Sequence, residues 1–125
     1  MHKIINSSGA PSPIGPYSQA TMAGNTLYVS GQIPLDPTTG NLVEGTIEEE
    51  TEMVMKNLSA ILTEAGTDFT SVVKCSIFVK DMSDFGKINE AYGKYFQENP
   101  PARETVEVSR LPKDVRVEIS CIAVL

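Results

Sequence analysis

The sequence predicts an α+β fold in which two helices pack on one face of a single sheet. Apolar residues alternate with polar ones in the closing segment, as in a strand with one buried face. Two internal segments show the helical period instead, and each begins at capping residues. The order of elements is strands, helix, strand, helix and two strands, which is typical of α+β proteins. Because the second face of such a sheet also needs cover, we expect a homo-oligomer.

The composition indicates one domain over residues 1–125, of which 41% are hydrophobic. The formal charge of -6 leaves no basic excess to neutralise phosphates, so we expect no nucleic-acid partner. No apolar run resembles a signal peptide or a membrane span, which predicts a cytoplasmic protein without a membrane partner. The only histidine is His2, so neither a histidine-based metal site nor a Ser-His pair is expected.

Short strands around a proline-rich loop are predicted for the N-terminal third. Residues 3–5 form a short strand, and three prolines and two glycines exclude a helix from residues 6–16. Residues 18–22 and 26–33 predict a hairpin with a glycine-containing turn. Inside its second strand, Gly31 indicates a bulge or the close approach of another group.

Two helices follow from caps and apolar spacing. Thr46 and Glu49 form a capping box, and apolar residues then recur at helical spacing through residues 47–65. A strand over residues 71–80 separates this helix from the second, which begins at a cap in residues 81–84 and ends before two prolines. The apolar stripe of the second helix, predicted to be core, comprises Phe85, Ile88, Tyr92, Tyr95 and Phe96. The two cysteines, Cys75 and Cys121, are predicted to be buried core residues.

The closing segment predicts two strands, over residues 103–109 and 115–125, with Arg103 and Glu118 on their less apolar faces. A plain hairpin would place Glu107 opposite Glu118. It would then hold Arg103 roughly 13 Å from Glu118 at the usual rise per residue, too far for both to contact one small molecule.

Seven short blocks carry a family resemblance. They are IGPYSQ (14–19), VSGQI (29–33), FVKDMSDF (78–85), NEAY (89–92), PAR (101–103), RLPKD (110–114) and VEI (117–119). Together and in this order they resemble the RidA (YjgF) family over nearly the whole chain. The resemblance implies a chorismate-mutase-like α+β domain with a mixed sheet, and a homotrimer with a central barrel-like core and clefts between subunits. It also implies that the final strand inserts between the strands at residues 26–33 and 71–80, which leaves the Arg103 strand at the edge.

The same resemblance implies a chemistry. Deaminases of the family hydrolyse reactive enamines and imines, such as 2-aminoacrylate released by pyridoxal-phosphate dehydratases, to 2-keto acids and ammonia, and they use no cofactor. Arg103 matches the carboxylate-binding arginine, whose planar guanidinium holds a carboxylate through two parallel bonds. Glu118 matches the acidic residue that moves protons to and from water. Further substrate contacts are predicted for Tyr17, Ser30, Gly31, Thr105, Phe85 and Asn89.

Two positions depart from the family pattern, and two other functions compete. Studied deaminases often carry cysteine where this chain has Thr105, and a small residue where it has Glu104.

A non-catalytic, regulatory protein that binds small carboxylates in the same cleft is the main alternative. Ribonuclease action, reported for some relatives, fits poorly with the acidic charge and the absence of a histidine in the predicted site.

Overall fold

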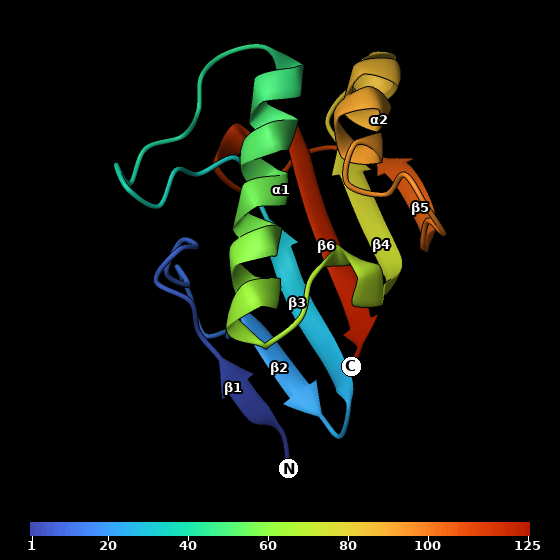
Figure 1. Ribbon diagram of the computed structural model, residues 1–125. Coiled ribbons are helices and arrows are strands. Elements are labelled where there is room, and N and C mark those ends of the chain that lie inside the picture. Colours follow the sequence, from blue (N-terminus) through green and yellow to red (C-terminus); the bar gives the residue numbers. More distant parts are fainter.

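The computed structural model describes residues 1–125 and shows a six-stranded sheet with two helices on one face (Figure 1). The helices are α1 (Ile47–Glu64) and α2 (Phe85–Gly93). The strands are β1 (Lys3–Ile5), β2 (Ala20–Ala23), β3 (Thr26–Gln32), β4 (Val72–Val79), β5 (Ala102–Glu107) and β6 (Val117–Val124). Their order across the sheet is β1-β2-β3-β6-β4-β5.

The last strand, β6, lies inside the sheet between β3 and β4 and pairs antiparallel with both. The edge strand β5 pairs only with β4, and that pair is parallel, so the sheet is mixed. The predicted insertion of the final strand is therefore confirmed. The plain hairpin between the two closing strands is wrong, because the turn at residues 112–114 carries the chain across β4 rather than back along β5.

The first helix has the predicted capping box. The Glu49 amide donates to the Thr46 hydroxyl, and the Glu49 carboxylate accepts from the Thr46 amide. The second helix is shorter than expected, because it ends at Gly93 and leaves Tyr95 and Phe96 in turns. Glycine weakens helices, which accounts for an end at Gly93. Tyr95 and Phe96 still pack against Phe69, although neither is helical.

The core lies between the sheet and the two helices. Leu58, Ile61 and Leu62 of α1 have no exposed surface, and Ile77 and Ile119 face them from the sheet. Both cysteines are buried and free, as predicted. A bulge between Val29 and Gln32 confirms the irregularity predicted at Gly31.

The less apolar face of β5, which was predicted to carry Arg103, turns toward the helix side of the sheet. In register, Arg103 of β5 is paired with Cys75, whose side chain is buried on the helix side of the sheet. Val106 instead points to the open face and is 40% exposed. The alternation separates the two faces of β5 but does not say which of them faces the helices, and at this edge strand the apolar face is not the one that packs on the chain's own core.

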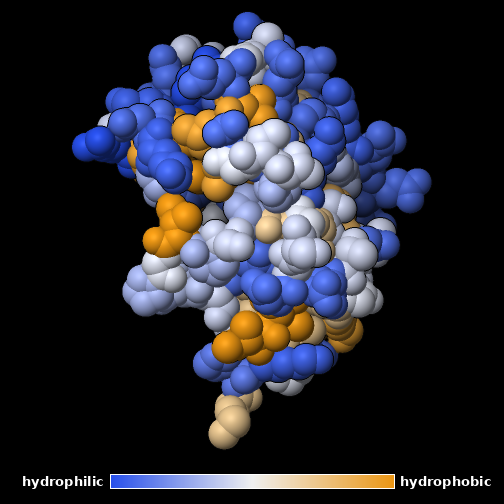
Figure 2. All heavy atoms as spheres, turned by 90° about the vertical axis from the view of Figure 1, so that its left-hand side faces the viewer, coloured by the Kyte–Doolittle hydropathy of each residue, from blue (hydrophilic) through white to orange (hydrophobic).

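Apolar residues on the open face leave a surface for which the chain itself offers no cover. Tyr28 of β3 is 49% exposed there, and Val106 of β5, at the other side of the same face, is 40% exposed. Figure 2, which looks onto the β1 side, shows hydrophobic atoms in separate patches among hydrophilic ones. Neither helix has the length and apolar character needed to cross a membrane. The predicted homo-oligomer stays a prediction.

Candidate active site in two halves

Glu118 sits on the open face of the sheet, against the bulge of β3. A β-carbon added to Gly31 would lie 2.8 Å from the carboxyl carbon of Glu118, so only glycine leaves room for this side chain. The Glu118 carboxylate is half-buried and has no hydrogen-bond donor or cation beside it within the chain. Burial raises the pKa of Glu118 above the usual value for glutamate. A carboxyl group with this pKa is suited to accept and return a proton.

A cavity of about 330 Å³ opens over Glu118. It brings together three more of the predicted residues, and its lining comprises Ile14, Tyr17, Ser30, Gly31, Ile33, Pro112 and Glu118. The Ser30 hydroxyl donates to the Ser18 carbonyl (2.7 Å) rather than pointing freely at the cavity. The cavity is therefore a preformed, mostly apolar space with one unpaired carboxylate.

Arg103 lies on the other side of the sheet, at the β5 edge. Its guanidinium carbon is 5.5 Å from the centre of the Phe85 ring and 5.1 Å from that of Tyr92, both on α2. Two aromatic faces hold a cation in place without neutralising it. Of the three arginines, Arg110 and Arg116 pair with carboxylates, whereas Arg103 has no acidic partner. It is a positioned cation available to an anion.

The remaining predicted contacts lie beside Arg103. Asn89 follows Phe85 by one helical turn and is exposed on α2. Thr105 shares the face of Arg103, and its hydroxyl oxygen is buried without a hydrogen-bond partner. Glu104 points to the opposite face, where its carboxylate is 2.8 Å from the Lys74 ammonium, so it does not oppose an anion at Arg103.

The structure thus gathers the predicted residues into two groups and separates the groups. Arg103 is paired with Cys75, and Glu118 with Phe78, three positions further along β4 and on the other face. Because β6 and β5 are two strands apart, the α-carbons of Arg103 and Glu118 are separated by roughly 14 Å. One chain therefore cannot bring Arg103 and Glu118 to the same small molecule.

Sequence reasoning missed two residues that shape these halves. Tyr92 was expected only as core, yet its ring also supports Arg103. Gln19 was noted only within a family block, yet it is a buried side chain that fixes the loop carrying Tyr17. Aromatic spacing could have indicated the first. No sequence signal distinguishes the second from an exposed glutamine.

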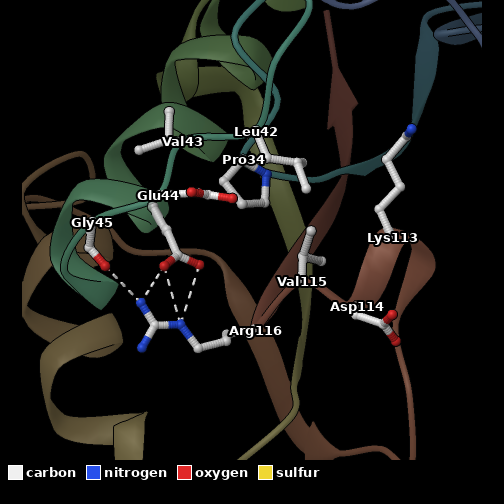
Figure 3. Close-up of a pocket in the computed structure, with 10 residues that line it drawn as sticks. Pro34, Leu42, Val43, Glu44, Gly45, Lys113, Asp114, Val115 and Arg116 are labelled. Carbon is white, nitrogen blue, oxygen red and sulfur yellow. Dashed lines mark hydrogen bonds and ion pairs between the residues drawn. The ribbon is translucent and has the colours of Figure 1, made fainter.

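The largest cavity, about 560 Å³, lies away from both groups, beside the first turn of α1 (Figure 3). Arg116 forms one wall: its Nε lies 3.0 Å from a Glu50 carboxylate oxygen, and its guanidinium donates to the Gly45 carbonyl (2.8 Å). Glu50 is 6% exposed. The ion pair ties the residue before β6 to α1, and we assign the cavity no chemistry.

Glu50→Ala should lower the free energy of unfolding by about 2 kcal/mol, since it leaves the Arg116 charge without its partner. We expect less than for a fully buried pair because the Arg116 side chain is 42% exposed and water can reach it. Urea denaturation measures the change, with the exposed Glu98→Ala as control. Equal stability of the two variants would contradict a structural role for this pair.

For the imine hydrolysis that the family resemblance implies, Gly31→Ala should lower kcat/KM by roughly 10- to 100-fold, because the added methyl group pushes the Glu118 carboxyl from its place. Gly86→Ala is the matched control: an added β-carbon there meets no atom within 4 Å. It should keep activity and stabilise α2 by about 0.5–1 kcal/mol. Full activity in Gly31→Ala would show that the Glu118 position is unimportant.

Together, the mixed sheet, the apolar cavity with its carboxylate and the unpaired arginine define a class: a small α+β protein with two separate groups of candidate site residues. The sequence profile described as Endoribonuclease L-PSP matches residues 7–125. The chain therefore belongs to this family, which is the RidA (YjgF) family.

Relatives agree in fold and differ in name. The chain is 51% identical over 124 residues to the rat 2-iminobutanoate/2-iminopropanoate deaminase, covering 99% of this chain and 90% of that protein. The solved structure of a Thermotoga maritima protein bearing the endoribonuclease name has a TM-score of 0.98 and 50% identity, with 100% and 98% coverage. The structure of Escherichia coli TdcF with bound serine has a TM-score of 0.94 and 40% sequence identity, with 98% of each chain covered.

Proposed function

We propose that this protein hydrolyses small 2-imino acids and their enamine tautomers, such as 2-aminoacrylate, to 2-keto acids and ammonia. The observation that carries the proposal is the pair of unneutralised groups: Arg103 packed against two rings, and Glu118 half-buried in the lining of an apolar cavity. The 51% identity to a protein named imine deaminase supports it. No cofactor is needed, because an imine carbon is already electrophilic.

In the proposed reaction, Arg103 binds the substrate carboxylate through two charge-assisted hydrogen bonds and so fixes the imine carbon. The Glu118 carboxylate takes a proton from water as the water oxygen bonds to that carbon, and the C=N electron pair moves to nitrogen. Protonated Glu118 then returns the proton to nitrogen. The carbinolamine then loses its hydroxyl proton to nitrogen, the C–N bond breaks as C=O forms, and ammonia leaves, so one imino acid and one water give one keto acid and one ammonia.

We further propose that the site is completed between copies of the chain, in a homotrimer. The opposite faces of Arg103 and Glu118 and the apolar open face of the sheet support a shared site. The number of three subunits rests on the family resemblance. A mixing experiment tests it: Arg103→Ala and Glu118→Gln subunits are unfolded together at equal amounts and refolded. Random assembly rebuilds about a quarter of the sites from two intact halves. No activity in the mixed assemblies would contradict a shared site.

The function itself is tested by supplying 2-aminoacrylate from a pyridoxal-phosphate dehydratase acting on serine, and following pyruvate formed. Spontaneous hydrolysis without the protein sets the baseline. We expect the protein to shorten the lifetime of the imine and to protect the dehydratase from it. Pyruvate release at the spontaneous rate would overturn the proposal.

One observation favours a second function, a non-catalytic sensor of small carboxylates. TdcF was solved with serine, which is not an imine, and the unpaired Arg103 would bind any such carboxylate. A sensor would bind serine or 2-ketobutyrate equally well after Glu118→Gln and would show no turnover. Calorimetric binding with and without that substitution, beside the pyruvate assay, separates the two functions.

A further inference from the structure

Gln19, the residue before β2, uses its whole carboxamide to hold one loop. It is 2% exposed, and its Oε1 accepts from the Ser7 amide (2.6 Å). Its Nε2 donates to the carbonyls of Ser7 (3.0 Å), Pro11 (3.0 Å) and Ala10 (3.4 Å). These backbone groups belong to the connection from β1 to β2, so the glutamine satisfies polar groups that would otherwise be buried unpaired.

The held segment is also packed against α1. Ala10 is 4% exposed, and a β-carbon on Gly9 would lie 3.2 Å from the Ala60 β-carbon. The backbone of residues 7–11 is therefore fixed between Gln19 and the helix. It cannot shift without breaking several hydrogen bonds at once.

The next residues, 12–18, which we name the Tyr17 loop, are tied at their far end as well. The Ser30 hydroxyl donates to the Ser18 carbonyl (2.7 Å), and the Ser30 amide donates to the Gln19 carbonyl (2.9 Å). Between these two ties the loop is exposed: Ile14 by 60% and Tyr17 by 48%. Both side chains line the cavity above Glu118.

Within the loop, local bonds set its shape. The Ile14 amide donates to the Tyr17 hydroxyl (3.3 Å), and the Tyr17 amide donates to the Gly15 carbonyl (2.9 Å). Few contacts other than the two ties hold so exposed a segment over Glu118. The position of the cavity wall therefore depends on the two attachments at the ends of the loop. The Gln19 side chain makes four hydrogen bonds at one end, and the Ser30 side chain makes one at the other.

We propose that Gln19 is a positioning residue for the imine-hydrolysing site: its carboxamide holds the Tyr17 loop over Glu118 before substrate arrives. This inference rests on the proposed function. Holding the loop in advance spares each substrate the cost of ordering it, so the effect falls mainly on binding. Gln19 itself reaches no substrate atom, because its polar atoms are used by the backbone.

Gln19→Met tests the proposal, since methionine fills a similar volume without the hydrogen bonds. We expect KM for the imine to rise about tenfold or more with a smaller change in kcat. Hydrogen exchange followed by mass spectrometry should show residues 7–18 losing protection, while β3 and β6 keep theirs. The matched control is Gln97→Met, at an exposed glutamine far from the cavity, which should change neither. If Gln19→Met does not fold, Gln19→Asn, which keeps a shorter carboxamide, should give the same two changes.

The outcomes separate the two claims. Wild-type protein without imine hydrolysis would overturn the proposed function and this inference with it. Active wild-type protein together with unchanged KM in the Gln19 variants would overturn only the positioning role, as would full protection of residues 7–18. An equal loss of protection in β3 and β6 would indicate general destabilisation and would also count against it.

Discussion

Arg103→Ala should lower kcat/KM for 2-aminoacrylate hydrolysis by about 10²- to 10⁴-fold, the worth of two charge-assisted hydrogen bonds. Arg103 has no carboxylate partner in the chain, so its substitution breaks no ion pair. Stability should fall by only about 1–2 kcal/mol, from the lost contacts with Phe85 and Tyr92. The pyruvate assay and thermal unfolding measure the two effects separately.

Two further variants sharpen the result. Arg103→Lys keeps the charge but loses the planar fork, and we expect activity between those of wild type and Arg103→Ala. Arg110→Ala removes an exposed arginine that pairs with Asp114, and it should keep full activity. Equal losses in Arg103→Ala and Arg110→Ala would mean that general charge, rather than carboxylate binding, matters.

Glu118→Gln should lower kcat by about 10²- to 10⁴-fold, because glutamine cannot take a proton from water. The pH profile of the wild type should reflect the same group. Burial raises the pKa of Glu118, and the base acts only when deprotonated. Activity should therefore decline on acidification at a higher pH than the ordinary glutamate value. Loss of the acidic limb in Glu118→Gln would accompany the loss of rate.

The raised pKa of Glu118 also predicts that Glu118→Gln, which lowers activity, raises the stability of the fold. The folded state binds the Glu118 proton more tightly than the unfolded chain, so its stabilising contribution is present below the unfolded pKa and is lost as pH rises through the folded pKa. At pH 7 the ionised Glu118 therefore destabilises the folded state. Glu118→Gln should melt at a higher temperature than wild type at pH 7, with the gain vanishing in acid. The exposed Glu98→Gln should show neither effect, and equal melting curves at pH 7 would contradict the burial argument.

Local signals predicted local structure well. The capping box at Thr46 and the bulge at Gly31 follow from steric and hydrogen-bonding rules that act within a few residues. The insertion of β6 between β3 and β4 is a long-range choice. Only the family resemblance indicated it, since alternation says which face a strand buries and not which neighbour it pairs with.

The failures have equally specific causes. The end of α2 at Gly93 was missed because the aromatic stripe continues past it. Phe96 lies outside the helix, yet its ring packs on Tyr92 as the ring of a helical residue would. The side of the sheet on which Arg103 lies was not predicted, because alternation separates the two faces of β5 without showing that two rings of α2 cover the less apolar one. Gln19 was overlooked because its importance depends on four backbone contacts that no periodicity shows.

The placement of Arg103 and Glu118 on opposite faces gives the chain an unusual relation to its own chemistry. In the proposed homotrimer each chain would give its arginine to one cleft and its glutamate to another, so the catalytic unit would be the contact between chains rather than the single chain. A newly made or highly diluted subunit would carry every necessary residue and still be inert. Assembly would act as the switch for activity, with protein concentration as its signal.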